Sequence, residues 1–329
     1  MIALRSVLVI RRDNIGDLVC TTPLLAALRG SYPCAWIGVL ANSYNAPALD
    51  GNPDVDEVFA YRKLKHVDQK GSAFVALGRR VAMLWALRRR KLDVAIVAAG
   101  ALDYNGERFA RMLSPARIVR SSPPASGQHE VERTFSAART LGYEGPIPPL
   151  RVVENADATS RIGAAIRLAG LKPPLIGVHI SARRIAQRWP TEYFAAFALE
   201  LRVRLGASVL LFWSPGAEDH PQHPGDDGKA ARIMSIVGAG GPLLPCPTAD
   251  LRDLVSGLAQ CDAIVCSDGG AMHLAAGLGK PVVCFFGDSP VDRWRPWGVR
   301  HTVLRAASNK VKDVPVEAAL AALAGLLQP

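Results

Sequence analysis

The chain has 329 residues, of which 49% are hydrophobic and 21% charged, and it carries a formal net charge of +10. This composition excludes an intrinsically disordered chain and fits a globular protein of about two domains. No apolar run approaches the roughly 18 residues of a membrane-spanning helix, and the six cysteines, which include no Cys-x-x-Cys pair, indicate neither a disulfide framework nor a zinc site.

The N-terminal segment predicts a strand rather than a leader peptide. Its apolar run, residues 7–10, is too short for a secretory signal and continues directly into Arg11 and Arg12. We therefore expect a cytoplasmic protein, whose basic charge favours peripheral contact with the inner face of the cytoplasmic membrane.

The first half of the chain alternates short apolar strands with helices. Strands are predicted at residues 6–10, 35–40 and 93–98, and helices at residues 21–29 and 74–88. The basic run at residues 88–91 matches the end of the second helix, where cations complement the helix dipole. Proline-rich stretches at residues 121–126 and 145–149 interrupt the alternation and predict loops.

A helix is predicted at residues 157–169, and Lys-Pro-Pro at residues 172–174 then opens a second series. Its strands are predicted at residues 175–180, 207–213, 263–266 and 282–286, and its helices at residues 191–205, 251–259 and 271–278. These apolar strands predict an α/β fold with two parallel sheets, each covered by helices on both faces. We expect domains at residues 1–170 and 171–329, with ligands at the carboxyl ends of the strands, in the cleft between the domains.

The turn after the strand at residues 263–266 is the first candidate binding site. It reads Ser-Asp-Gly-Gly-Ala-Met-His over residues 267–273. Gly269 and Gly270 allow a ligand to approach the backbone, and the unpaired N–H groups of the following helix favour an anion such as a diphosphate. The alternative is a tight turn in which Asp268 only caps the helix.

Two other strand ends in the second half carry polar candidates. Glu218 follows the strand at residues 207–213, and its carboxylate suits the two hydroxyls of a ribose, or else a helix N-terminus. Ser181 and Arg188 follow the strand at residues 175–180 and suit phosphate oxygens. We expect the neighbouring Trp189 to serve in packing.

In the first half, the strand at residues 6–10 is followed by Arg11, Arg12, Asp13, Asn14, Ile15, Gly16 and Asp17. The glycine permits close approach of a ligand, and Asp17 at a helix start suits a reactive carboxylate pointing into the cleft. Helix capping is the alternative for both Asp13 and Asp17.

Taken together, these segments resemble glycosyltransferase family 9, the ADP-heptose:lipopolysaccharide heptosyltransferases. Asn-Ile-Gly-Asp at residues 14–17 with Thr-Thr-Pro-Leu at residues 21–24 is similar to the opening of that family, and Asp-Gly-Gly-Ala-Met-His-Leu-Ala-Ala at residues 268–276 is similar to its second signature. Further matching segments extend the resemblance from about residue 5 to residue 300; they lie at residues 188–190, 216–218, 279–283, 286–287, 292–294 and 296–298.

The resemblance implies a GT-B fold, in which two Rossmann-like domains hold the donor mainly on the C-terminal one. It also implies inverting, metal-independent transfer without a cofactor, with Asp17 as the general base that takes the proton of the acceptor hydroxyl. The donor residues implied by position are Arg188, Glu218, Asp268, Gly269, Gly270 and His273. Ser181 joins them because it follows the strand at residues 175–180. The acceptor-side residues expected are Arg11, Arg12 and Asp13.

The chain departs from the family pattern at two positions. The family commonly has a lysine two residues before the tryptophan of the segment at residues 188–190, and this chain has Gln187. Relatives often have threonine where this chain has Gly269. We therefore expect either that Arg183, Arg184 or Arg188 replaces the missing cation, or that the donor is not ADP-heptose.

Charge and motifs bear on the partners and on other functions. Residues 1–150 hold 20 Lys and Arg against 13 Asp and Glu, a net +7, which favours an acidic glycolipid acceptor and anionic headgroups. A nucleotide-sugar epimerase or hydrolase shares the architecture and is the alternative enzyme. This chain lacks the Gly-x-Gly-x-x-Gly motif that a nicotinamide dehydrogenase carries after its first strand, and it has no nucleic-acid-binding motif.

Asp54 and Asp56 form an Asp-x-Asp pair, a pattern that can bind a divalent metal ion. The pair precedes a strand instead of following one, which argues against a metal site.

Overall fold

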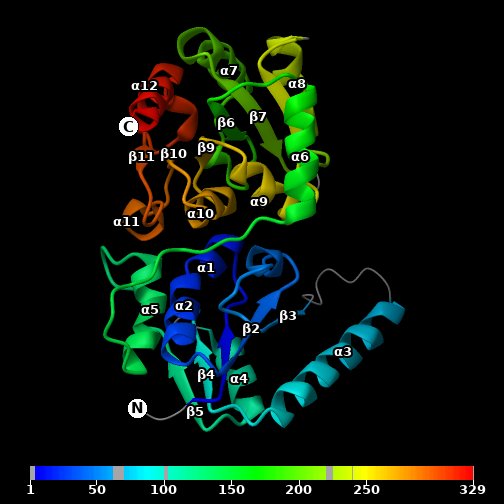
Figure 1. Ribbon diagram of the computed structural model, residues 1–329, viewed down its shortest axis with the longest axis vertical. Helices are drawn as coiled ribbons and strands as arrows, with labels where there is room; N and C mark the ends of the chain where they lie inside the picture. The colour runs from blue at the N-terminus through cyan, green and yellow to red at the C-terminus, as the bar shows by residue number, and fades with distance from the viewer. Residues whose placement is uncertain (1–3, 62–69, 100–102, 220–224, 239, 329) are drawn as a thin grey trace. The chain divides into compact units, whose positions relative to one another are not determined.

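The computed structural model describes residues 4–61, 70–99, 103–219, 225–238 and 240–328 (Figure 1). The chain divides into two compact units, Met1–Arg151 and Val152–Pro329. Within the described residues, no helix is both long and apolar enough to cross a membrane.

The first unit is built on a five-stranded parallel sheet of order β3-β2-β1-β4-β5. Its strands are β1 (Ser6–Ile10), β2 (Trp36–Asn42), β3 (Glu57–Tyr61), β4 (Val94–Val97) and β5 (Arg117–Arg120). Its helices are α1 (Ile15–Val19), α2 (Thr22–Ser31), α3 (Lys70–Arg89), α4 (Tyr104–Leu113) and α5 (Glu130–Thr140), with the 3₁₀ turn Ala46–Leu49 after β2.

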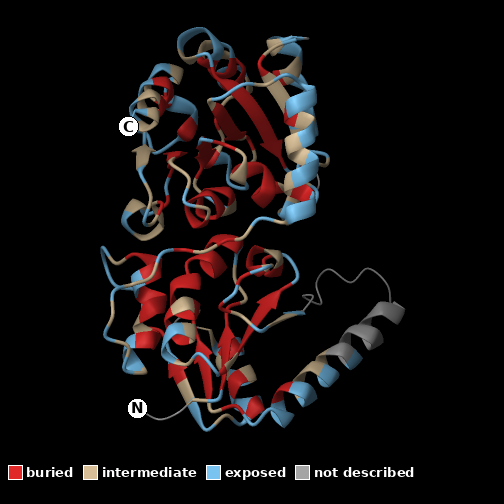
Figure 2. Ribbon diagram, in the orientation of Figure 1, coloured by how far each residue is buried: buried red, intermediate tan, exposed pale blue. Residues whose placement is uncertain are grey.

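The central strand β1 is buried on both faces because its side chains alternate between two cores. Val7 and Val9 enter one core with residues of α2 and α5. Leu8 and Ile10 enter the other, which contains Leu87 of α3. Figure 2 shows the strands of this sheet as largely buried. The apolar run from Val7 to Ile10 is therefore what a strand covered on both faces requires.

The second unit is built on a six-stranded parallel sheet of order β11-β10-β9-β6-β7-β8. Its strands are β6 (Leu175–His179), β7 (Ser208–Trp213), β8 (Leu243–Pro247), β9 (Ala263–Ser267), β10 (Val282–Phe285) and β11 (His301–Leu304). Its helices are α6 (Ala156–Leu168), α7 (Thr191–Leu205), α8 (Asp227–Val237), α9 (Leu251–Ala259), α10 (Gly270–Gly277), α11 (Val291–Trp294) and α12 (Val316–Leu327), with 3₁₀ turns at Ile185–Gln187 and Val311–Asp313.

The structure corrects the expected boundary between the domains. We expected residues 152–170 to belong to the first domain, but they form part of the second unit. Asn155 and Ser256 exchange two hydrogen bonds, of 3.0 and 3.2 Å, that connect the start of α6 to α9. The amide of Val152 donates to the carbonyl of Gly277 at 3.0 Å. The proline-rich Lys-Pro-Pro at residues 172–174 is therefore a turn inside the second unit.

The predicted strands and helices are confirmed to within a few residues at their ends, and α7 and α9 have the predicted bounds. The strand expected after the Asp-x-Asp pair is β3, and the helix expected to start near Asp17 is α1. The elements without a counterpart among the predicted ones are β5, β8, β11, α4, α5, α8, α11 and α12. Strands β3 and β5 form the two edges of the first sheet, and β8 and β11 those of the second, so three of the four edge strands were not predicted.

Candidate active site

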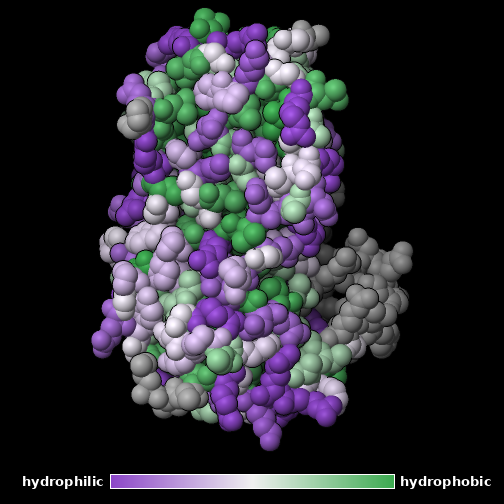
Figure 3. Space-filling view, in the orientation of Figure 1, coloured by the Kyte–Doolittle hydropathy of each residue, from purple (hydrophilic) through white to green (hydrophobic). Residues whose placement is uncertain are grey.

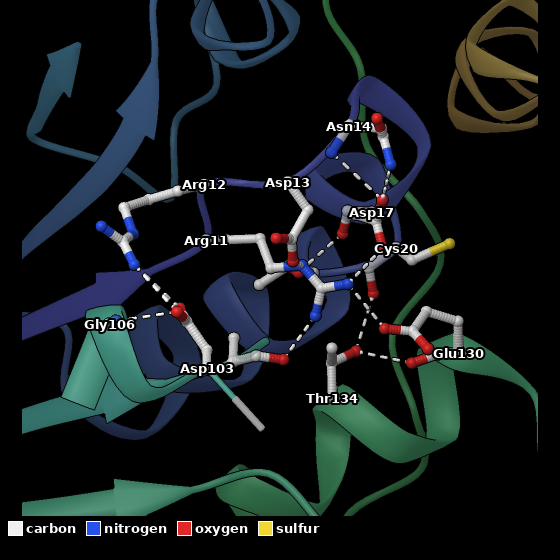
Figure 4. Close-up of polar contacts among 12 residues, drawn as sticks. Arg11, Arg12, Asp13, Asn14, Asp17, Cys20, Asp103, Gly106, Glu130 and Thr134 are labelled. Carbon is white, nitrogen blue, oxygen red and sulfur yellow. Dashed lines mark hydrogen bonds and ion pairs between the residues drawn. The ribbon is translucent and has the colours of Figure 1, made fainter. Parts of the chain in front are cut away.

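The carboxyl end of β1 leads into α1 through a short polar loop, and Asp17 lies in the first turn of that helix (Figure 4). The Asp17 side chain keeps 11% of its exposure. Its Oδ2 accepts hydrogen bonds from the Asn14 backbone amide at 3.1 Å and from Asn14 Nδ2 at 3.0 Å. Oδ2 of Asp17 thus takes part in capping the N-terminus of α1, as the alternative interpretation expected. Oδ1 of Asp17 contacts a different partner.

That partner is Arg11, whose Nη2 lies 2.5 Å from Asp17 Oδ1. The same nitrogen lies 2.6 Å from Glu130 Oε1, and Nη1 donates to the carbonyl of Ala98. Burial lowers the pKa of the Arg11 guanidinium, but Asp17, Glu130 and Asp13 together raise it by more, so the net shift is upward. Arg11 is thus a permanently charged group beneath Asp17.

This placement corrects the expectation that Arg11 binds the acceptor. The residue is 1% exposed and its donors go to protein groups. Arg12 is partly buried and pairs with Asp103, which in turn accepts from the Gly106 amide at the start of α4. Asp13 keeps a side-chain exposure of 40%, so of the three expected acceptor-side residues it is the most accessible.

In the second unit, Asp268 lies between the end of β9 and the start of α10. Its Oδ2 accepts from Gln187 Nε2 at 2.8 Å, and Gln187 also donates to Ser289 Oγ at 2.9 Å. Burial raises the pKa of Asp268, although hydrogen bonds from Ser289 and Gln187 act in the opposite direction. Gln187 is therefore a buried partner of Asp268 rather than an exposed loop residue.

The glycine turn before α10 leaves room next to the backbone. A Cβ built on Gly269 would lie 3.9 Å from the carbonyl oxygen of Ser267 and no closer to any other described group. Packing within the protein therefore does not explain the glycine at position 269. An anion bound at the first turn of α10 would explain it, because a side chain there would occupy the space next to the backbone N–H groups. His273, within α10, is 2% exposed, and its ring meets the edge of Trp294 at a centroid distance of 6.0 Å.

The remaining donor candidates line the ends of β6 and β7. Ser181 Oγ accepts from the Ser214 amide at 2.9 Å, which joins the two loops. Arg188 donates through Nε to the Ala182 carbonyl at 3.0 Å. Glu218 is exposed in the loop that leads to α8. The carboxyl edge of the second sheet thus carries the expected residues after β6, β7 and β9.

Sequence reasoning missed Lys229, which lies in the first turn of α8 and is 8% exposed. Its Nζ donates to the Ile180 carbonyl at 3.0 Å, where β6 ends. Burial lowers the pKa of Lys229 to about 8, and the positive charge of Arg188 adds to this shift. The one feature of the sequence that could have identified Lys229 is its position near the start of a helix. Because α8 was not predicted, this feature was not recognised.

Glu130 and Arg133 of α5 were also missed. Glu130 is fully buried and binds both Arg11 and Arg133. Burial alone would raise the pKa of Glu130, but Arg133 and Arg11 outweigh it and lower the pKa to about 2. Glu130 is therefore an ionised carboxylate behind the Asp17 site.

The Asp-x-Asp pair at residues 54–56 makes protein contacts instead of facing a ligand site. Asp54 pairs with Arg151 at 2.9 Å. Asp56 accepts from the Ile37 amide at 2.7 Å and from Arg29 at 2.6 Å. These contacts tie the loop before β3 to the body of the first unit.

Comparison with known proteins matches this chain to one family over most of its length. The model of glycosyltransferase family 9 (heptosyltransferase) matches residues 83–322. Lipopolysaccharide heptosyltransferase 2 of Salmonella typhimurium is 28% identical over 91% of this chain and 87% of that protein.

Among solved structures, a glycosyl transferase family 9 protein from Veillonella parvula superposes with a TM-score of 0.81 at 18% identity, over 98% of this chain and 97% of that one. The E. coli ADP-heptose LPS heptosyltransferase II superposes with a TM-score of 0.76 at 22% identity, over 98% of both chains. The two-sheet architecture is therefore shared with these proteins, which confirms the predicted GT-B fold.

Proposed function

Because the chain belongs to glycosyltransferase family 9 and is a glycosyltransferase, we propose that it transfers a heptose, or a related sugar, from an ADP-sugar to a lipopolysaccharide-core-type acceptor. We propose further that transfer inverts the anomeric carbon and needs neither a metal ion nor a cofactor. The first unit would bind the acceptor and the second unit the donor. The names of the Salmonella and E. coli relatives support the choice of donor and acceptor.

The observation that carries this proposal is the fixed carboxylate of Asp17 at the carboxyl end of β1. Arg11 and Asn14 occupy defined sides of that carboxylate, which restricts its orientation. In the proposed reaction Asp17 takes the proton of the acceptor hydroxyl as its oxygen bonds to the anomeric carbon. The bond between that carbon and the diphosphate oxygen breaks, and the electron pair leaves with ADP.

Negative charge builds on the departing diphosphate, and the second unit offers groups to stabilise it. The first turn of α10 presents backbone N–H groups after Gly269. Arg188 adds a guanidinium at the end of β6. Fixed donors of this kind stabilise the transition state more than the ground state, because the charge on the leaving group is largest there. Glu218, exposed before α8, is the proposed contact to the ribose.

Helix α3 supports the proposed contact with the membrane surface. Between residues 70 and 91 the chain carries seven Lys and Arg and no Asp or Glu. Val81 is 59% and Trp85 60% exposed, and the Arg89 guanidinium lies 4.2 Å from the centre of the Trp85 ring. Figure 3 shows hydrophilic side chains near the C-terminal end of α3, at the bottom of the view. Exposed tryptophan among arginines suits an interface with anionic headgroups.

The proposed function is tested by nucleotide titration and product analysis. Calorimetric titration with ADP, UDP and GDP is expected to show tightest binding of ADP, and equal binding of all three would refute the ADP assignment. Incubation of ADP-heptose with a core-type acceptor is expected to give a glycosylated acceptor and ADP. Release or epimerisation of the sugar at the same rate without acceptor would instead indicate a hydrolase or an epimerase.

A further inference from the structure

The Asp17 carboxylate belongs to a buried chain of alternating charges that extends into α5. Arg11 Nη2 lies between Asp17 Oδ1, at 2.5 Å, and Glu130 Oε1, at 2.6 Å. Glu130 is held on its other side by Arg133, whose Nε donates to Oε2 at 2.9 Å and whose Nη2 donates to Oε1. The carbonyl of Ala98 accepts from both arginines. The chain therefore runs Asp17, Arg11, Glu130, Arg133, and Figure 4 shows its first three members.

An arginine next to a catalytic carboxylate has two opposite effects: it orients the carboxylate, and it makes protonation of the carboxylate less favourable. A guanidinium favours the ionised carboxylate and so opposes the protonation that a general base must undergo. Arg11 touches Asp17 with the same nitrogen that touches Glu130. Because the pKa of Glu130 is lowered to about 2, Glu130 stays negative throughout the neutral range and offsets part of the positive charge of Arg11.

The other groups around Asp17 do not supply this compensation equally well. Asp13 contacts Arg11 Nε at 3.2 Å but keeps 40% of its side-chain exposure, so water screens its charge. Asn14 is neutral. The Cys20 thiol behind α1 has its pKa raised, chiefly by burial, and so stays uncharged. Glu130, with a side-chain exposure of 0%, is the best-placed counter-charge among these groups.

We infer that Glu130 is a positioning residue for glycosyl transfer. It fixes Arg11 beneath Asp17 and offsets part of the charge that the guanidinium presents to the carboxylate, so that Asp17 is oriented while its uptake of a proton is opposed less. This inference rests on the proposed role of Asp17 as the general base.

The test is the pH dependence of kcat/KM for Glu130→Gln. The amide keeps the size and the acceptor oxygen of Glu130 but removes its charge, so Arg11 stabilises the Asp17 carboxylate more strongly. We expect kcat/KM to fall by about tenfold and the acidic limb of the profile to move to lower pH, by about one unit. The affinity for ADP, which belongs to the second unit, is expected to stay unchanged. Glu130→Asp, which keeps the charge, is expected to leave the limb in place.

Three results would overturn the inference. One is full activity in Glu130→Gln, and another is a lower rate with an unmoved acidic limb, since a purely structural defect has that effect. If Glu130→Gln does not fold, as judged by circular dichroism, Arg133→Gln is measured instead. Because this change removes a positive charge, the acidic limb of the profile is expected to move to higher pH. An acidic limb that does not move in Arg133→Gln is the third contrary result. Wild-type turnover in Asp17→Asn would separately refute the proposed base.

Discussion

Gln187 donates a hydrogen bond from Nε2 to Asp268 Oδ2 at 2.8 Å, and the same amide nitrogen lies 2.9 Å from Ser289 Oγ. A neutral amide therefore faces a partly buried carboxylate, at the position where the resemblance to family 9 leads us to expect a lysine. The proposed diphosphate site thus receives no positive charge from residue 187. Its attraction for the donor depends on the first turn of α10 and on nearby arginines.

Replacing Gln187 by lysine tests this electrostatic deficit. An ammonium beside Asp268 adds a charge-assisted donor, which contributes about 1.5–3 kcal/mol. We expect Gln187→Lys to bind ADP about tenfold more tightly or better in calorimetric titration. Gln187→Met is the matched control that removes the amide without adding charge. Equal ADP affinity in wild type and Gln187→Lys would show that residue 187 does not face the diphosphate.

Removing the Asp17 carboxylate tests the proposed base. Asp17→Asn is expected to lower turnover by about 10²- to 10⁴-fold, because the amide takes no proton from the acceptor hydroxyl. The ADP affinity is expected to be unchanged, since the donor residues belong to the second unit. Glu144→Gln, an exposed change in the first unit, is the control and should retain wild-type turnover. The measurement is initial-rate kinetics beside a calorimetric ADP titration.

Trp189 is expected to contribute stability rather than contact the substrate. It is 1% exposed, stacks on Phe285 at 4.6 Å between centroids and donates from Nε1 to the Val314 carbonyl at 2.8 Å. Trp189→Ala should lower the free energy of unfolding by about 3–5 kcal/mol in urea denaturation. Leu168→Ala, at a residue 92% exposed, should change it by less than about 0.5 kcal/mol. Comparable losses in the two variants would contradict this packing role.

The buried Lys229 predicts a pH-dependent stability. Burial lowers its pKa from the usual 10.5 to about 8, so the folded state binds fewer protons than the unfolded state between these values. The stability of the wild type relative to Lys229→Met should therefore rise with pH from about 8 to about 10.5. Urea denaturation at pH 7 and at pH 10 measures the difference. A difference that is the same at both pH values would show that the ammonium is not desolvated.

Helix α3 predicts binding to anionic vesicles. Each arginine near a negatively charged surface contributes about 1 kcal/mol, so the double change Arg88→Gln and Arg89→Gln should weaken binding by about 30-fold. Trp85→Ala should weaken it further through the loss of apolar contact. Co-sedimentation with vesicles of phosphatidylglycerol and phosphatidylcholine measures this, with Arg167→Gln of α6 as the control. Equal binding to purely zwitterionic vesicles would contradict the electrostatic basis.

The central strands were predictable from sequence because burial on both faces leaves a continuous apolar run. Residues 7–10 and 263–266 show this pattern, and polar loop residues follow each of them. Edge strands are harder to predict because they are only partly buried and their sequence has no continuous apolar run. Strand β5 begins and ends with arginine and buries only its third residue, so its pattern does not differ from that of a surface loop.

The chain of charges behind Asp17 could not be predicted for another reason. Glu130 is 119 positions from Arg11, and only the packing of α5 beside β1 brings them together. Acidic residues in the first turn of a helix are also common, because they complement the helix dipole. Nothing local therefore distinguishes Glu130 from an ordinary capping residue such as Glu132, which accepts from the His129 amide at 2.9 Å.

The division of the chain at Arg151 and Val152 has a consequence for recombination between family members. Every strand pairing in the two sheets joins residues on the same side of that peptide bond. A chimera joined there exchanges one whole sheet with its helices and leaves the other intact, whereas a junction at residue 170 would separate α6 from α9. If acceptor and donor preference reside on different units, a single crossover at this bond would recombine the two specificities independently.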